Sequence, residues 1–146
     1  LRAEEDRLAV IEGLRDGTID CIATDHAPHT VDDKKVEYDQ AAFGIVGLET
    51  AVALCLDRLL GEGVIDLPRL VALLSTNPAR VLALPGGTLA VDAPADVTIL
   101  DLKRRRKVDP ARFESKGRCT PFAGLTLKGW PVTTIVGGKI VWTDRK

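Results

Sequence analysis

A short apolar run at residues 19–23 stops abruptly at three polar residues, Thr24, Asp25 and His26. The run has the length and residue types of a β-strand, and polar side chains at its carboxyl end are typical of a buried parallel strand. Helix-like patterns flank it on both sides. One strand cannot pair its backbone donors and acceptors by itself, so we expect its neighbours in a parallel sheet to belong to sequence preceding Leu1.

The absence of methionine points the same way. The chain begins with Leu and contains no Met, so it does not start at an ordinary translation initiator, and we expect a truncated chain. The alternative is that the first half is a small helical unit with a paired edge strand.

Hydrophobic spacing predicts the remaining helices. Residues 4–15 suit an amphipathic helix with an acidic first turn, and residues 48–60 a mostly apolar helix. Pro68 and Asn77-Pro78 mark two further helix starts, with Asn77 as an N-cap. Residues 27–40 are charged and aperiodic, which favours a long functional surface loop.

The spacing of hydrophobic residues changes from helix-like to strand-like in the second half of the chain. Residues 96–102, 132–136 and 139–143 read as strands, and Gly137-Gly138 is a hairpin signal between the last two. We therefore predict an α/β segment over residues 1–84, followed by a β-rich unit over residues 85–146.

Composition excludes several classes of protein. The formal net charge is −1, with 20 Lys+Arg against 21 Asp+Glu, which disfavours general nucleic-acid binding. No apolar run reaches about 18 residues and the acidic N-terminus lacks a signal peptide, so we expect a cytoplasmic protein without a membrane span. We expect Cys21, Cys55 and Cys119 to be small buried hydrophobes, because their spacing supports neither disulfides nor a thiolate zinc site.

Both histidines lie in one five-residue stretch, Asp25-His26-Ala27-Pro28-His29. An Asp at the carboxyl end of a parallel strand, with His in the following loop, is the usual placement of catalytic groups in a (β/α)₈ barrel. The competing interpretation is that Asp25 caps a loop and both His lie on the surface. Metal binding by these three residues alone is disfavoured, because such a local chelate lacks supporting groups.

A longer match carries a family resemblance. Residues 24–30, followed by Phe43-Gly44-Ile45-Val46-Gly47-Leu48-Glu49-Thr50, resemble the final barrel segment of class I bacterial dihydroorotases of the amidohydrolase superfamily. Further matches, such as Asp16-Gly17-Thr18-Ile19-Asp20 and Thr120-Pro121-Phe122-Ala123-Gly124, extend the resemblance over essentially the whole chain. It implies the C-terminal segment of a (β/α)₈ TIM-type barrel, followed by part of a small β-sandwich domain.

The same resemblance implies an activity and a set of site residues. The activity is reversible zinc-dependent hydrolysis of the cyclic amide of dihydroorotate to N-carbamoyl-aspartate, a step of pyrimidine synthesis. One or two zinc ions would polarise the carbonyl and make hydroxide available. The resemblance assigns Asp25 as the catalytic proton carrier and a metal ligand, and His29, Phe43 and Gly44 to substrate binding. We expect His26 to orient the loop.

The chain lacks the remaining ligands of that family. These are a His-x-His pair, a carboxylated Lys and two further His, all upstream in family order. We therefore expect this chain alone to have no turnover and no tight zinc site. The resemblance also implies a homo-oligomer and, for some members, assembly with aspartate carbamoyltransferase.

Two other functions are open at this point: a cyclic amidase of the allantoinase or hydantoinase type, and a non-catalytic scaffold partnering aspartate carbamoyltransferase. His29 argues against the first, and retention of Asp25 with His29 against the second. We interpret the basic run at residues 103–107 as a solvated turn after a strand ending at Leu102, and not as a nucleic-acid site. Trp130 and Trp142 are interpreted as packing residues.

Overall fold

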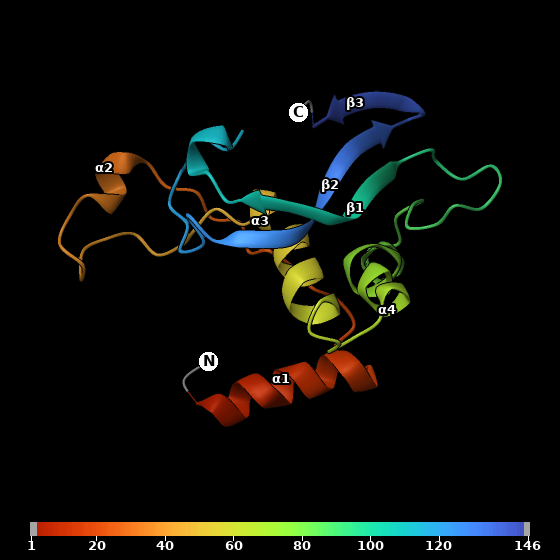
Figure 1. The fold of residues 1–146 in the computed structure, drawn as a ribbon, viewed down its shortest axis with the longest axis horizontal. Helices are drawn as coiled ribbons and strands as arrows, with labels where there is room; N and C mark the ends of the chain where they lie inside the picture. The colour runs from red at the N-terminus through yellow and green to blue at the C-terminus, as the bar shows by residue number, and fades with distance from the viewer. Residues whose placement is uncertain (1–2, 145–146) are drawn as a thin grey trace.

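The computed structural model describes residues 3–144, in which a helical half precedes a three-stranded antiparallel sheet (Figure 1). The strands lie in the order β1-β2-β3, so β2 is central. The helical segments are α1 (Glu4–Asp16), α2 (Val31–Lys34), α3 (Leu48–Leu54), η1 (Cys55–Leu60), α4 (Leu67–Val71), η2 (Ala72–Thr76), α5 (Asn77–Val81) and η3 (Pro110–Arg112). The strands are β1 (Val97–Lys107), β2 (Thr126–Val136) and β3 (Lys139–Thr143).

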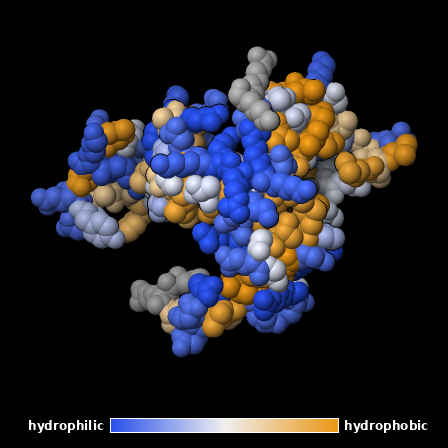
Figure 2. Space-filling view, in the orientation of Figure 1, coloured by the Kyte–Doolittle hydropathy of each residue, from blue (hydrophilic) through white to orange (hydrophobic). Residues whose placement is uncertain are grey.

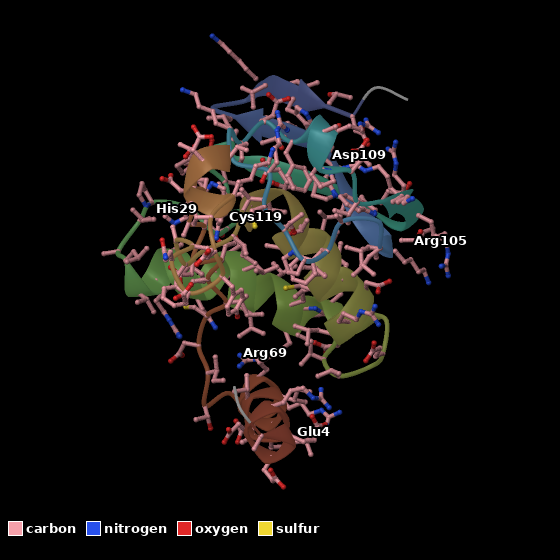
Figure 3. The ribbon with its side chains drawn as sticks, turned by 90° about the vertical axis from the view of Figure 1, so that its left-hand side faces the viewer. Glu4, His29, Arg69, Arg105, Asp109 and Cys119 are labelled. Atoms are coloured by element: carbon pink, nitrogen blue, oxygen red, sulfur yellow. The ribbon has the colours of Figure 1, made fainter. Side chains whose placement is uncertain are left out.

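The first predicted helix is confirmed as α1. Its first turn carries three acidic residues, which favour the positive end of the helix dipole, and Gly17 closes it in the left-handed conformation with φ 95°. The guanidinium of Arg69 holds the end of this helix by donating to the carbonyls of Leu14 (2.9 Å) and Ile19 (2.8 Å) (Figure 3).

The strand expected at residues 19–23 is not formed in this structure. The segment is extended chain without strand pairing and is only partly buried. Its Ile22 N–H donates to the carbonyl of Leu73 in η2, at 3.0 Å. A strand needs a neighbouring strand to pair its backbone N–H and C=O groups. Among residues 3–144, no other strand lies beside this run, so no ladder of hydrogen bonds forms.

Asn77 is not the N-cap that the sequence predicts. Residues 67–81 are helical throughout, and Asn77 has helical angles, φ −69° and ψ −46°. Because Pro78 has no N–H and its ring crowds the preceding turn, the helix widens to π-type hydrogen bonding over Ala72–Thr76 and continues. The side chain of Asn77 instead donates to the carbonyl of Asp20, at 2.8 Å.

The basic run does not form the predicted turn. Strand β1 continues through it to Lys107, with an irregularity in pairing between Asp101 and Arg105. Asp144, whose side chain is only 4% exposed, accepts from Arg104 and Arg106, each at 2.9 Å. Buried charges need partners, so this carboxylate stabilises part of the run in the extended conformation.

Other expectations in the second half have mixed outcomes. The hairpin is confirmed, since Gly137 and Gly138 both have positive φ (53° and 77°) and join β2 to β3. Trp130 is buried, as expected of a packing residue, whereas Trp142 is 39% exposed. The cysteine expectation holds for Cys55 alone, because Cys21 is partly exposed and Cys119 is exposed.

The sheet packs against the helical half through two buried clusters. One consists mainly of helical residues, Leu14, Cys55, Leu56, Ile65, Leu70 and Leu73. The other joins helix and sheet through Val46, Ala53, Val108, Phe113, Leu127 and Trp130. The backbones approach closely at Gly129 of β2, where a Cβ atom would lie only 2.7 Å from the Cβ of Leu56. A larger residue at this position would separate the sheet from η1.

Much apolar surface remains uncovered. Leu89, Val91 and Ile140 are 83%, 91% and 68% exposed. A groove of about 770 Å³ with largely apolar walls also runs between α4 and β1. Figure 2 shows several apolar patches, in orange, on one face of the molecule. No helix among residues 3–144 is long and apolar enough to cross a membrane.

This surface predicts weak cooperativity for the 146-residue chain by itself. We expect it to bind the dye ANS and to unfold over a broad temperature range, because exposed apolar faces favour loosely packed or associated states. Calorimetry and dye fluorescence would measure both properties. A sharp transition of a monomer that binds no dye would contradict the prediction.

Candidate functional site

The site begins where the extended segment ends, at Asp25 and His26. Asp25 is exposed and has φ 46°, a left-handed conformation that is uncommon outside glycine. His26 turns back, and its Nδ1 accepts hydrogen bonds from the backbone N–H groups of Gly47 (3.0 Å) and Leu48 (3.4 Å). It therefore satisfies free donors at the start of α3, and its predicted loop-orienting role is confirmed.

His29, Gly44 and Phe43 form the next part of the site. Gly44 has φ 120°, and a Cβ atom there would lie 2.7 Å from the Cβ of Ala27 and 3.2 Å from Nε2 of His29. Only glycine fits this approach, so two of the predicted substrate residues, His29 and Gly44, are in close proximity. Phe43 is 97% exposed and projects into solvent beside them. A bond from Ala27 N–H to the carbonyl of Ile45 (2.9 Å) joins the two loops.

The segment after η3 supports this pair of loops from behind. At Gly117 a Cβ atom would lie 2.8 Å from the Cβ of Pro28, so this segment packs directly under the histidine loop. The N–H of Val46 donates to the carbonyl of Cys119, at 3.0 Å. Figure 3 shows His29 and Cys119 on the same side of the molecule, away from Arg105 and Asp109.

Glu49 links the site to the same supporting segment, and sequence reasoning did not single it out. One carboxylate oxygen accepts from the N–H of Ser115 at 2.8 Å, and the other is buried without a hydrogen-bond partner in the described part of the chain. Burial raises the pKa of Glu49, but hydrogen bonding by Ser115 outweighs it, so the pKa lies below its ordinary value. The sequence signal that could have identified Glu49 as part of the site was its position in the Gly-Leu-Glu-Thr run.

The described residues do not form a metal site by themselves. Within residues 3–144, no group of three or more His, Cys, Asp or Glu side chains is placed to hold an ion. A zinc ion in a protein usually has three or four protein ligands. Asp25 can offer one carboxylate, and the Nδ1 of His26 is engaged by the start of α3.

Comparison with known proteins defines the class. The pattern of the amidohydrolase family matches residues 1–141, and the chain belongs to this family. Such proteins are generally metal-dependent hydrolases.

Curated relatives are more specific. The chain is 56% identical over 146 residues to a dihydroorotase of Halalkalibacterium halodurans, covering all of this chain and 34% of that protein. It is 58% identical over 145 residues to a dihydroorotase of Pelotomaculum thermopropionicum, covering 99% of this chain and again 34% of the relative. The chain thus spans about a third of the length of the curated relatives it matches.

Solved structures agree on the fold. An L-hydantoinase (dihydropyrimidinase) from Arthrobacter aurescens superposes with a TM-score of 0.91 at 34% identity, over 99% of this chain and 33% of that one. A dihydropyrimidinase from Brevibacillus agri gives the same TM-score at 20% identity, over 100% of this chain and 33% of that one, and shows the fold alone. The mixed helix-and-sheet arrangement is therefore that of amidohydrolases.

The lowered pKa of Glu49 predicts a pH dependence for its contact with Ser115. The contact should be fully formed above the ordinary carboxyl pKa of about 4.3 and lost as the pH falls through the lower pKa of the folded state. We would follow the Ser115 amide by NMR in a chimera, in which this chain replaces the matching segment of the Halalkalibacterium halodurans dihydroorotase. A titration midpoint of the Ser115 amide signal at or above the ordinary carboxyl pKa would refute this prediction.

Proposed function

We propose that this chain is the segment of a dihydroorotase that carries the proton-transfer carboxylate and one side of the substrate site. The reaction is the reversible hydrolysis of dihydroorotate to N-carbamoyl-aspartate. The observation that carries the proposal is the loop from Asp25 to His29 packed onto Gly44. Curated relatives named dihydroorotase, 52–58% identical over at least 97% of this chain, support it.

Asp25 is the proposed catalytic residue. Its carboxylate is exposed, and its unusual backbone conformation turns it out of the extended segment, where water and substrate can reach it. It takes the proton of the attacking water and delivers it to the leaving ring nitrogen, since a carboxylate can both accept and donate a proton. Zinc supplies carbonyl polarisation when bound, and Asp25 contributes one ligand to a site completed by residues outside this chain.

His29, Phe43 and Gly44 are the proposed substrate-binding residues. Dihydroorotate carries a carboxylate, and the imidazole of His29 offers a hydrogen-bond donor for it. Phe43 is exposed and Gly44 packs against His29, so the backbone groups around these two residues are the proposed contacts to the pyrimidine ring. The pairing of His29 with Gly44 fixes the distance between these two contacts.

The finer architecture is part of this proposal. Residues 1–84 would be the C-terminal part of a (β/α)₈ barrel, with residues 19–23 paired as a strand once neighbouring strands are present. Residues 85–146 would supply strands of a β-sandwich beside it. A cytoplasmic homo-oligomer, with a contact to aspartate carbamoyltransferase through the basic face of β1, remains a prediction.

A related cyclic amidase is the second candidate. The 34% identity to the L-hydantoinase favours it, but identity to several proteins named dihydroorotase is above 50%. The two functions differ in the substrate carboxylate. Inhibition by orotate, which has the carboxylate, compared with inhibition by uracil, which lacks it, separates them.

The isolated chain should hydrolyse no dihydroorotate and bind no zinc tightly. The reason is that Asp25 is one ligand where three or four are needed. A coupled absorbance assay with added zinc and a zinc titration by calorimetry test both statements. Zinc-dependent turnover by this polypeptide would contradict them.

Site variants of the chimera should separate catalysis from binding. D25N should lower kcat by at least about a hundredfold, because the proton carrier is lost. H29A should raise KM by about tenfold, with little change in kcat, because it removes a contact to a charged group of bound substrate. D32N, which removes an exposed carboxylate from α2, is the matched control for D25N and should change neither constant. Equal loss in D25N and D32N would refute the assignment.

H29A also tests substrate class. Its loss of affinity should be large for orotate and negligible for uracil. Equal loss for both inhibitors would favour the hydantoinase type of amidase.

A further inference from the structure

The short helix α2 carries a lysine that reaches across to the backbone on both sides of Phe43. The ammonium of Lys34 donates to the carbonyl of Ala42 at 2.5 Å and to the carbonyl of Gly44 at 2.6 Å. The side chain is half-buried, and hydrogen bonds from a charged donor are stronger than neutral ones. One ammonium therefore holds two carbonyls that flank a single exposed aromatic residue.

The same helix is tied to His29 at its other end. Thr30, which follows His29, accepts from Asp33 N–H at 3.2 Å, while Thr30 N–H donates to the Asp33 carboxylate at 3.1 Å. The Thr30 hydroxyl also donates to this carboxylate, at 2.7 Å. This hydroxyl bond, together with the backbone bond from Thr30, lowers the pKa of Asp33, so the reciprocal cap is formed near neutral pH. The carbonyl of Asp33 also accepts from Ala42 N–H, at 3.2 Å. A four-residue helix thus connects the histidine loop to the Phe43 loop.

We propose that Lys34 is a positioning residue for the substrate site, which holds Phe43 and Gly44 in register with His29. This inference rests on the proposed function. Gly44 lies close against Ala27 and His29 with a positive φ of 120°, which glycine adopts without strain. Without the ammonium, the two carbonyls no longer converge. The loop that carries Phe43 and Gly44 then samples other conformations. Substrate affinity should fall more than the rate of proton transfer, because Asp25 is not among the residues that Lys34 holds.

Kinetics of the chimera test the role. K34M keeps the aliphatic stem and removes the donors, and it should raise KM by about tenfold with kcat changed less than about threefold. K34R keeps charge and donors and should restore most of the affinity. K35M, on the exposed neighbouring lysine, is the matched control and should leave both constants unchanged. If K34M does not fold, K34Q, whose neutral amide group keeps two N–H donors, should show a smaller rise in KM.

Hydrogen exchange tests the positioning independently of turnover. The amides of Ala27 and Ala42, which bridge the two loops, should exchange at least about tenfold faster in K34M than in the parent chimera or in K35M. Unchanged exchange and unchanged KM in K34M would overturn the inference, as would an equal loss in K35M. A folded parent chimera without turnover, in which K34M still speeds exchange, would instead count against the proposed function.

Discussion

The close approach of strand β2 to the helical half is the contact on which the rest of the structure depends. Gly129 lets the strand lie against Leu56, and the surrounding apolar side chains bury α3 and η1 beneath the sheet. Because α3 packs against the sheet, the position of its first residues is fixed. His26 caps those residues, and the loop that carries Asp25 and His29 is thereby anchored to the core.

From this anchor the site is assembled by short-range hydrogen bonds between loops. Ala27 bonds to Ile45, Gly44 closes on His29, and Lys34 ties the second loop to the first. The segment at Ser115 and Gly117 then supports both from behind. Loops held in this way can keep polar groups exposed to substrate without a large core of their own, which is how catalytic loops on a rigid scaffold usually work.

Local patterns predicted local structure well. The acidic first turn and Gly17 identified α1, and the Gly137-Gly138 pair identified the hairpin, because both depend on residues near in sequence. The prediction failed where distant partners decide. The basic run stays extended because Asp144 pairs with two of its arginines, and the side chain of Asn77 donates to the distant carbonyl of Asp20 instead of capping a helix. The run at residues 19–23 has strand-forming residues but no strand beside it.

The sequence by itself determined which residues are proposed to carry the chemistry, because an Asp and two His within five residues, followed by the Phe-Gly-Ile-Val-Gly-Leu-Glu-Thr run, form a specific combination. Tertiary structure alone decided how they are arranged. His26 faces the start of α3, His29 faces Gly44, and Lys34 and Glu49 belong to the surroundings of the site. The physical reason is that each of these contacts joins a side chain to the backbone of another segment, and their meeting depends on how the helices and sheet pack.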